Sequence, residues 1–158
     1  MAVTLQKTIK ISGEPVGRSL RKRYREASQP AWEETGQQFH LQMRPQRFTE
    51  SHAKEAKYKR RATKYTKRKQ RKFGHRNPLE YTGTTKALVR TARIKARGGT
   101  GQLGSRGGVQ VIYRGARQFN RRNPHSDIDM VDEFTRLTDR EALLLGIAFE
   151  TRFQARFQ

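Results

Sequence analysis

Two features of the sequence could support nucleotide or metal chemistry. The first is the string Gly99-Thr100-Gly101-Gln102-Leu103-Gly104, which matches the glycine pattern of dinucleotide-binding turns. Such a turn binds pyrophosphate only where its glycines join a strand to a helix. Here a second strand is expected to follow, and no acidic residue comes before Asp127. We therefore interpret this string as the tip of a β-hairpin.

The second feature is a carboxylate cluster, which could hold a divalent ion for nuclease chemistry. It lacks the spacing of a calcium loop, and pairing with basic residues is its simpler role. The four histidines are too scattered for a helical zinc motif, and the chain has no cysteine. We expect a protein that is not an enzyme and has no metal or cofactor, with a nuclease as a minor alternative. The cluster consists of Asp127, Asp129, Asp132 and Glu133.

Positive charge is the dominant chemical feature. The 158 residues include 35 Lys and Arg against 14 Asp and Glu, a formal net charge of +21. Residues 56–126 contain 21 of these cations and a single acid, Glu80. Such a segment repels itself, and phosphates offset the repulsion while releasing their condensed counterions. We expect nucleic acid or another polyanion beside it; a solvated cationic face is the alternative.

The cations predicted to contact this polyanion should bind backbone phosphates without reading base sequence, because no sequence-reading motif is present. Tyr58, Tyr65 and Phe73 lie among them. Their spacing of 7 and 8 residues favours packing along one helical stripe over stacking on bases. The predicted contacts are Lys57, Lys59, Arg60, Arg61, Lys64, Lys67, Arg68, Lys69, Arg71, Lys72, Arg76, Arg90, Arg93, Lys95 and Arg97.

The elements that must position these side chains indicate an α+β fold with a small antiparallel sheet, in a single domain over residues 1–158. Apolar residues alternate with polar ones near the start of the chain, at Val3, Leu5, Ile9 and Ile11, as in a half-buried strand. Two further strands are expected over 86–96 and 109–114. A flexible glycine-rich tip at 98–108 should join them.

Helices are expected between the first and second strands. A basic connection over 18–25 should lead to a short helix from about Pro30, which Pro45 interrupts. Proline is favoured at the first position of a helix, so Pro45 can also open a long basic helix over about 45–72. Its second half has no acidic residue and should repel itself.

The C-terminal helix is the best-defined element of the sequence. Thr138 and Glu141 form a capping box before an amphipathic run, which predicts a helix over about 139–157. Only 33% of the residues are hydrophobic, and the mean hydropathy is −1.00, so a lone monomer would bury little apolar surface. We expect an oligomer whose subunit contacts are Leu143, Leu144, Ile147, Phe149 and Phe153.

Membrane insertion and secretion are not expected. No apolar stretch of about 18 residues is present, and no apolar region follows basic residues near Met1. A membrane partner is therefore not predicted, and we expect the chain to be made in the cytoplasm.

Short motifs between Trp32 and Leu145 resemble the small neck and tail-completion proteins of tailed bacteriophages. They are Trp32, Phe39-His40, Met43-Arg44-Pro45-Gln46-Arg47-Phe48, Phe73-Gly74-His75 and Pro78-Leu79-Glu80-Tyr81-Thr82-Gly83, with a basic helix before the last two. In that family a Pro-Leu-x-x-(Ser/Thr)-Gly string leads from a basic helix into an antiparallel sheet. This chain departs from the pattern in its far greater basic charge and in lacking the usual acidic or aromatic sequence after the second hairpin strand.

The resemblance implies a structural subunit of the virion, in a ring that is commonly sixfold and surrounds the DNA path between portal and tail. Its implied partners are copies of itself, portal or adaptor proteins, tail-tube proteins and the DNA backbone. The main alternative is a ribosomal-type or other non-catalytic RNA-binding protein, which would combine a small fold with basic segments ordered by RNA.

Overall fold

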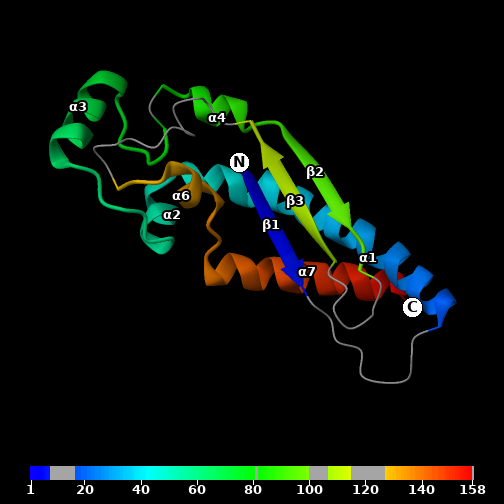
Figure 1. Cartoon of the computed structure of the whole chain (residues 1–158). Helices are drawn as coiled ribbons and strands as arrows, with labels where there is room; N and C mark the ends of the chain where they lie inside the picture. The colour runs from blue at the N-terminus through cyan, green and yellow to red at the C-terminus, as the bar shows by residue number, and fades with distance from the viewer. Residues whose placement is uncertain (8–16, 81, 100–106, 115–126, 158) are drawn as a thin grey trace.

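A three-stranded antiparallel sheet and two long helices form the body of the protein. The computed structural model describes residues 1–7, 17–80, 82–99, 107–114 and 127–157 (Figure 1). The strands are β1 (Ala2–Lys7), β2 (Ala92–Arg97) and β3 (Gly107–Tyr113), in the order β1-β3-β2. The α-helices are α1 (Arg18–Gln38), α2 (Glu50–Glu55), α3 (Thr63–Phe73), α4 (Thr84–Leu88), α6 (Met130–Thr135) and α7 (Asp139–Phe157). The predicted α+β class is confirmed, whereas the single domain stays a prediction.

One face of the sheet is apolar and packs on α1. Val3 and Leu5 lie opposite Val111 and Val109, and Ile94 completes the row on the far side of β3. A Cβ atom on Gly36 would lie 2.7 Å from the Cγ2 atom of Val109, so the glycine allows α1 to approach the sheet closely. The alternation that predicted β1 and β3 is confirmed within the described residues. The predicted strand positions Ile9 and Ile11, and most of the glycine-rich tip, lie outside them.

The second predicted strand is shorter than expected. Residues 86–96 were expected to form one strand, but α4 occupies Thr84–Leu88 and β2 begins only at Ala92. Gly83, with φ of 82°, starts the helical turn at a backbone conformation that glycine adopts without strain. Leu88 belongs to this turn and is partly exposed, so it does not continue the apolar row of β2.

Helix α1 corrects the prediction for the residues before Pro45. The expected basic connection 18–25 is helical, and the expected short helix from Pro30 is the second half of a helix of 21 residues that contains this proline. Packing outweighs the cost of the proline, because one helical stripe is buried against the sheet and α7. This stripe consists of Tyr24, Ala27, Ser28, Ala31, Trp32, Thr35 and Gly36.

The predicted continuous helix over 45–72 is wrong. A π-helical turn (Phe39–Met43) and a 3-10 turn (Arg44–Phe48) follow α1, and Thr49 is extended and caps α2 with its hydroxyl. The chain then leaves the helical conformation at Lys57, whose φ is 53°, and returns to it in α3. A long-range contact explains the break, since the backbone N–H of Lys59 donates to Glu133 at 2.9 Å instead of to a helical carbonyl.

The predicted C-terminal helix is confirmed, with its capping box. The N–H of Thr138 donates to Oε2 of Glu141 at 3.0 Å, and the N–H of Glu141 donates to the Thr138 hydroxyl at 3.2 Å. The helix packs beside α1 (Figure 1), and the ring of Phe149 stacks on Trp32 with centroids 3.9 Å apart. Phe149 is fully buried, so it belongs to the core of its own chain and is not available as a subunit contact.

A buried ion pair joins the 3-10 turn to the start of α7. The Arg47 side chain is completely buried, and its Nη1 donates to Oε2 of Glu141 at 2.9 Å. The same nitrogen contacts Nε2 of His52, and the guanidinium lies over the ring of Phe39 at 5.2 Å. Glu141 therefore caps α7 and neutralises a buried cation at the same time, which makes it a junction of α2, α7 and the turn between α1 and α2.

We predict that Glu141→Gln lowers the free energy of unfolding by about 3–5 kcal/mol, because it leaves Arg47 buried without an opposite charge. Glutamine is also a capping-box residue, so the substitution retains the helix cap and tests the charge alone. Urea denaturation provides the measurement. The control is Glu26→Gln, which removes an exposed ion pair with Lys22 and should change the free energy by less than about 0.5 kcal/mol.

His52 predicts a loss of stability in mild acid. Its burial, together with the nearby Arg47 guanidinium, lowers the pKa of the imidazole below its ordinary value. The unfolded state then binds the proton more readily than the folded state, so stability should fall as the pH drops below about 6.5. His52→Gln retains a hydrogen-bond acceptor for Arg47 without the titration. Denaturation midpoints between pH 7.5 and 5 should decline less for this variant; parallel declines would contradict the assignment.

Candidate nucleic-acid interface

The sheet face turned away from α1 is open and basic. Arg93, Lys95 and Arg97 alternate with the apolar residues of β2 and are exposed on this face. On the adjacent strand β3, Gln110 pairs with Lys95 and Gly108 pairs with Arg97. Successive cations on one strand face lie about 6.6 Å apart, since the rise is about 3.3 Å per residue. The face therefore offers a regular row of positive charge bordered by uncharged polar side chains.

A second group of predicted cations lies on and around α3. This helix has no acidic residue, and it projects from one end of the molecule, away from the sheet (Figure 1). Its last turn ends at Gly74 in the left-handed conformation with φ of 72°, a common helix C-terminus. The exposed predicted cations of this region are Lys57, Lys59, Arg60, Lys64, Lys67, Arg68, Arg71, Lys72 and Arg76.

The two groups form separate surfaces. Arg90 is exposed in the connection between α4 and β2, so it lies along the chain between them. Arg93, Lys95 and Arg97 belong to the sheet, whereas the remaining predicted contacts belong to the segments around α3. The sequence predicted both groups, and the structure places α3 at one end of the molecule, away from the sheet that carries β2 (Figure 1).

Two predicted phosphate contacts are instead part of the fold. Lys69 is 4% exposed and its ammonium donates to the carbonyl of Asn77, which fixes the loop after α3. Burial lowers the pKa of this amine. Arg61 forms a two-pronged ion pair with Glu133, with nitrogen–oxygen distances of 2.8 and 2.5 Å. Neither side chain is free to serve a phosphate backbone, because both already have internal partners.

The carboxylate cluster has structural roles. Asp129 caps α6 by accepting from the N–H groups of Val131 and Asp132, and Asp132 pairs with Arg136 one turn later. Glu133 binds Arg61 and the backbone of Lys59. The expected pairing of this cluster with the basic segment is confirmed at Glu133.

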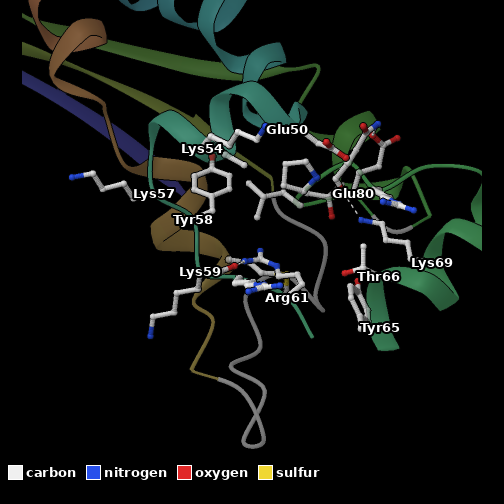
Figure 2. Close-up of a pocket in the computed structure, with 18 of the residues that line it drawn as sticks. Glu50, Lys54, Lys57, Tyr58, Lys59, Arg61, Tyr65, Thr66, Lys69 and Glu80 are labelled. Carbon is white, nitrogen blue, oxygen red and sulfur yellow. Dashed lines mark hydrogen bonds between the residues drawn. The ribbon is translucent and has the colours of Figure 1, made fainter. Parts of the chain in front are cut away.

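A hollow of about 630 Å³ lies between the end of α2, helix α3 and the loop that follows α3 (Figure 2). Tyr58 lies across it from Tyr65 and Thr66. The apolar part of its wall includes Ala53, Pro78, Leu79 and Met130. Cations surround this wall, so the hollow combines a hydrophobic interior with a positive rim.

Glu80 holds the loop that closes this hollow. Burial would raise the pKa of Glu80, but hydrogen bonds from Asn77 and Lys86 outweigh it and lower the pKa below the usual value. The distances to its Oε2 are 3.2 Å from Asn77 and 3.3 Å from Lys86. The carboxylate is therefore charged at neutral pH and ties both ends of the loop together.

The predicted single stripe of three aromatics does not form, because Tyr58 lies outside α3 while Tyr65 and Phe73 lie within it. Tyr58 packs against the hydrophobic core and contacts the His52 ring with centroids 5.6 Å apart, as the packing interpretation predicted. The sequence did not indicate the hollow itself, since it arises where the chain folds back after α3. The one local sequence feature that could have pointed to the hollow is Glu80, the lone acid of the basic segment 56–126.

An apolar stripe is exposed on α7. Leu143 and Ile147 are 64% and 52% exposed, and Leu144 lies beside them at 44%. Phe153, the fifth predicted subunit contact, stacks on Phe149 and packs against the core. Three of the five predicted contacts are therefore available to a partner, whereas the two phenylalanines stabilise the chain itself.

Within the described ranges, no group of three or more histidine or acidic side chains is arranged to hold a metal ion. Over the same ranges, no helix combines the length and apolar character needed to cross a membrane. Comparisons with protein-family models, with curated proteins and with solved structures find nothing that matches this chain.

Proposed function

We propose that the protein is a non-catalytic structural subunit of a phage neck or tail-completion assembly, located in the virion. In this proposal it forms a ring that joins head and tail, with basic surfaces toward DNA or acidic neighbours. Three lines support it: the motif series between Trp32 and Leu145, the charge of +21, and the geometry of the exposed side chains.

The observation that carries the proposal is the separation of two kinds of surface. Arg93, Lys95 and Arg97 project from the sheet face opposite α1, whereas the stripe of Leu143 and Ile147 lies on α7, which packs beside α1. A subunit that must contact both a polyanion and a neighbouring protein needs such a division. An enzyme would instead need its reactive groups gathered in one site.

The mechanism follows from the chemistry of these surfaces. Lys and Arg on exposed helix and strand faces contact phosphates, release counterions and hold the duplex without selecting a sequence. The apolar stripe contributes to binding between subunits by removing leucine and isoleucine side chains from water. Together they would hold a basic surface of repeated subunits around a DNA path.

The alternative, an RNA-binding protein of the ribosomal type, is supported by the open sheet face. Its row of cations next to Thr4, Gln6 and Gln110 could bind the backbone of a single strand. Oligomeric state discriminates the two proposals, since the RNA-binding protein would function as a monomer on its RNA.

We predict that the purified protein forms closed rings in negative-stain micrographs and that Leu143→Glu converts them to monomers, because a charge in the stripe cannot be buried without a partner. Leu41→Glu is the matched control, since Leu41 is 67% exposed and lies outside α7. Analytical ultracentrifugation measures both variants. Monomers of the unmodified protein that copurify with RNA would favour the alternative.

We predict that neutralising the exposed cations of α3 flattens the salt dependence of duplex DNA binding. The slope of log K against log salt should shrink by up to about 0.9 for each phosphate that the variant leaves unneutralised. The variant replaces four exposed residues with glutamine and leaves the buried Lys69 unchanged. The four are Lys67, Arg68, Arg71 and Lys72.

The control for this measurement removes the same number of charges from elsewhere on the protein. It should leave the slope nearly unchanged, because its cations lie on α1 and α7. Equal slopes for both variants would mean that only total charge matters and would contradict a DNA contact at α3. The control replaces Arg18, Lys22, Arg25 and Arg140, all of which are exposed.

A further inference from the structure

The hollow between α2 and α3 has the size of a small-molecule site. Its volume of about 630 Å³ falls within the range of about 300–1,000 Å³ that is typical of ligand pockets. Leu79, which is 7% exposed, forms part of its wall together with Pro78 and Met130. Tyr58 and Tyr65 line it from different sides (Figure 2). The interior can therefore accept a flat, partly apolar group.

Backbone strain is concentrated around this hollow. Among the described residues, Lys57 and Leu79 are the non-glycine residues with positive φ, at 53° and 54°, and both line the hollow. Such strained conformations cluster at ligand-binding sites. Lys57 precedes α3 in the sequence and Leu79 follows it. Strained backbone therefore flanks the hollow in both segments that connect to α3.

A buried donor in the wall has no partner. The hydroxyl oxygen of Tyr58 is inaccessible to solvent and makes no hydrogen bond within the described part of the chain. Burial raises the pKa of this phenol, so it keeps its proton and can donate. Because solvent does not reach this hydroxyl, it faces the core beside His52, and a ligand in the hollow can contact the ring of Tyr58 but not its oxygen.

The rim of the hollow carries an excess of positive charge. Lys59, Arg61 and Lys69 have internal partners. Glu80 is already bound by Asn77 and Lys86. Four other lining cations make no ion pair with any residue that the structure describes: Lys54, Lys57, Arg60 and Arg76. Lys57 extends away from the hollow, and Glu50 is a further lining acid, so the excess of positive charge at the mouth comes from Lys54, Arg60 and Arg76 (Figure 2).

We propose that this hollow binds one nucleoside phosphate, with its base between the tyrosine walls and its phosphate on the cationic rim. The inference rests on the proposed function, which it deepens by adding an unpaired nucleotide to contacts with the duplex backbone. A simple anion would leave the apolar wall and Tyr58 unused. An acidic peptide would satisfy the rim but would place no flat group between Tyr58 and Tyr65.

The unpaired nucleotide can come from a single strand or from a free nucleotide. The test therefore measures binding of the full chain to fluorescein-labelled dT10, to a labelled duplex of ten base pairs, and to AMP by calorimetry. AMP should displace dT10 at lower concentration than inorganic phosphate or polyglutamate does. Direct AMP binding identifies the free nucleotide as a sufficient ligand, whereas displacement of dT10 only by unlabelled single strands assigns the site to a strand.

A pair of variants on one helix isolates the hollow. Thr66→Trp fills it, because Thr66 lines the hollow, whereas Thr63→Trp places the same side chain at an exposed position outside it. Thr66→Trp should weaken dT10 binding about tenfold, the effect expected for one stacked base, and leave duplex binding within about twofold. Thr63→Trp should change neither affinity by more than about twofold.

Tyr65→Leu keeps the inference testable if the tryptophan variant folds poorly. It removes an aromatic side chain that lines the hollow but keeps an apolar one, so the affinity for dT10 should fall about fivefold to tenfold while duplex binding stays within about twofold. An unchanged affinity for dT10 in the folded variant would overturn the inference. So would equal effects of Thr66→Trp and Thr63→Trp, or phosphate competing as well as AMP. In those cases an intact salt slope at α3 would leave the proposed function standing.

Discussion

The buried ion pair between Arg47 and Glu141 is the constraint on which the arrangement of the helices depends. A fully buried guanidinium is tolerated only with a charged partner, and the partner lies 94 residues away in the first turn of α7. The pair therefore fixes the 3-10 turn that follows α1 (Arg44–Phe48) against the start of α7. His52 joins the same cluster from α2, so the chain must enter the basic segment from this position. The exposed stripe of α7 is set by the same contact.

A second buried carboxylate decides the path of the basic segment. Glu133 accepts from the Lys59 backbone and from both terminal nitrogens of Arg61, which holds residues 59–61 outside a helix. The hollow beside Tyr58 exists because of this break, since a continuous helix would leave no fold between α2 and α3. The acids of α6 thus act within the chain, and they remove Arg61 from the set of cations that can meet a polyanion.

The sequence predicted those elements whose signals are local. The capping box of Thr138 and Glu141 defined α7, and alternation at Val3 and Leu5 defined β1. Helix α1 was missed in its first half because its buried stripe is made largely of small residues such as Ala27 and Ser28, which carry little hydropathy signal. The break after α2 could not be predicted, because it depends on Glu133, some seventy residues later. Burial of Lys69 and Phe149 likewise depends on tertiary partners.

The fold accounts for how a chain of +21 can be stable while keeping most of its charge exposed. Several cations make contacts inside the fold, among them Arg47, Arg61 and Lys69, and each of these three has a carboxylate or carbonyl partner. The other cations of α3 and those of β2 remain in water, where solvent and salt screen their repulsion. If the proposed polyanion binds them, each exposed cation gains a phosphate partner at little prior cost, and binding would stabilise the folded chain by mass action.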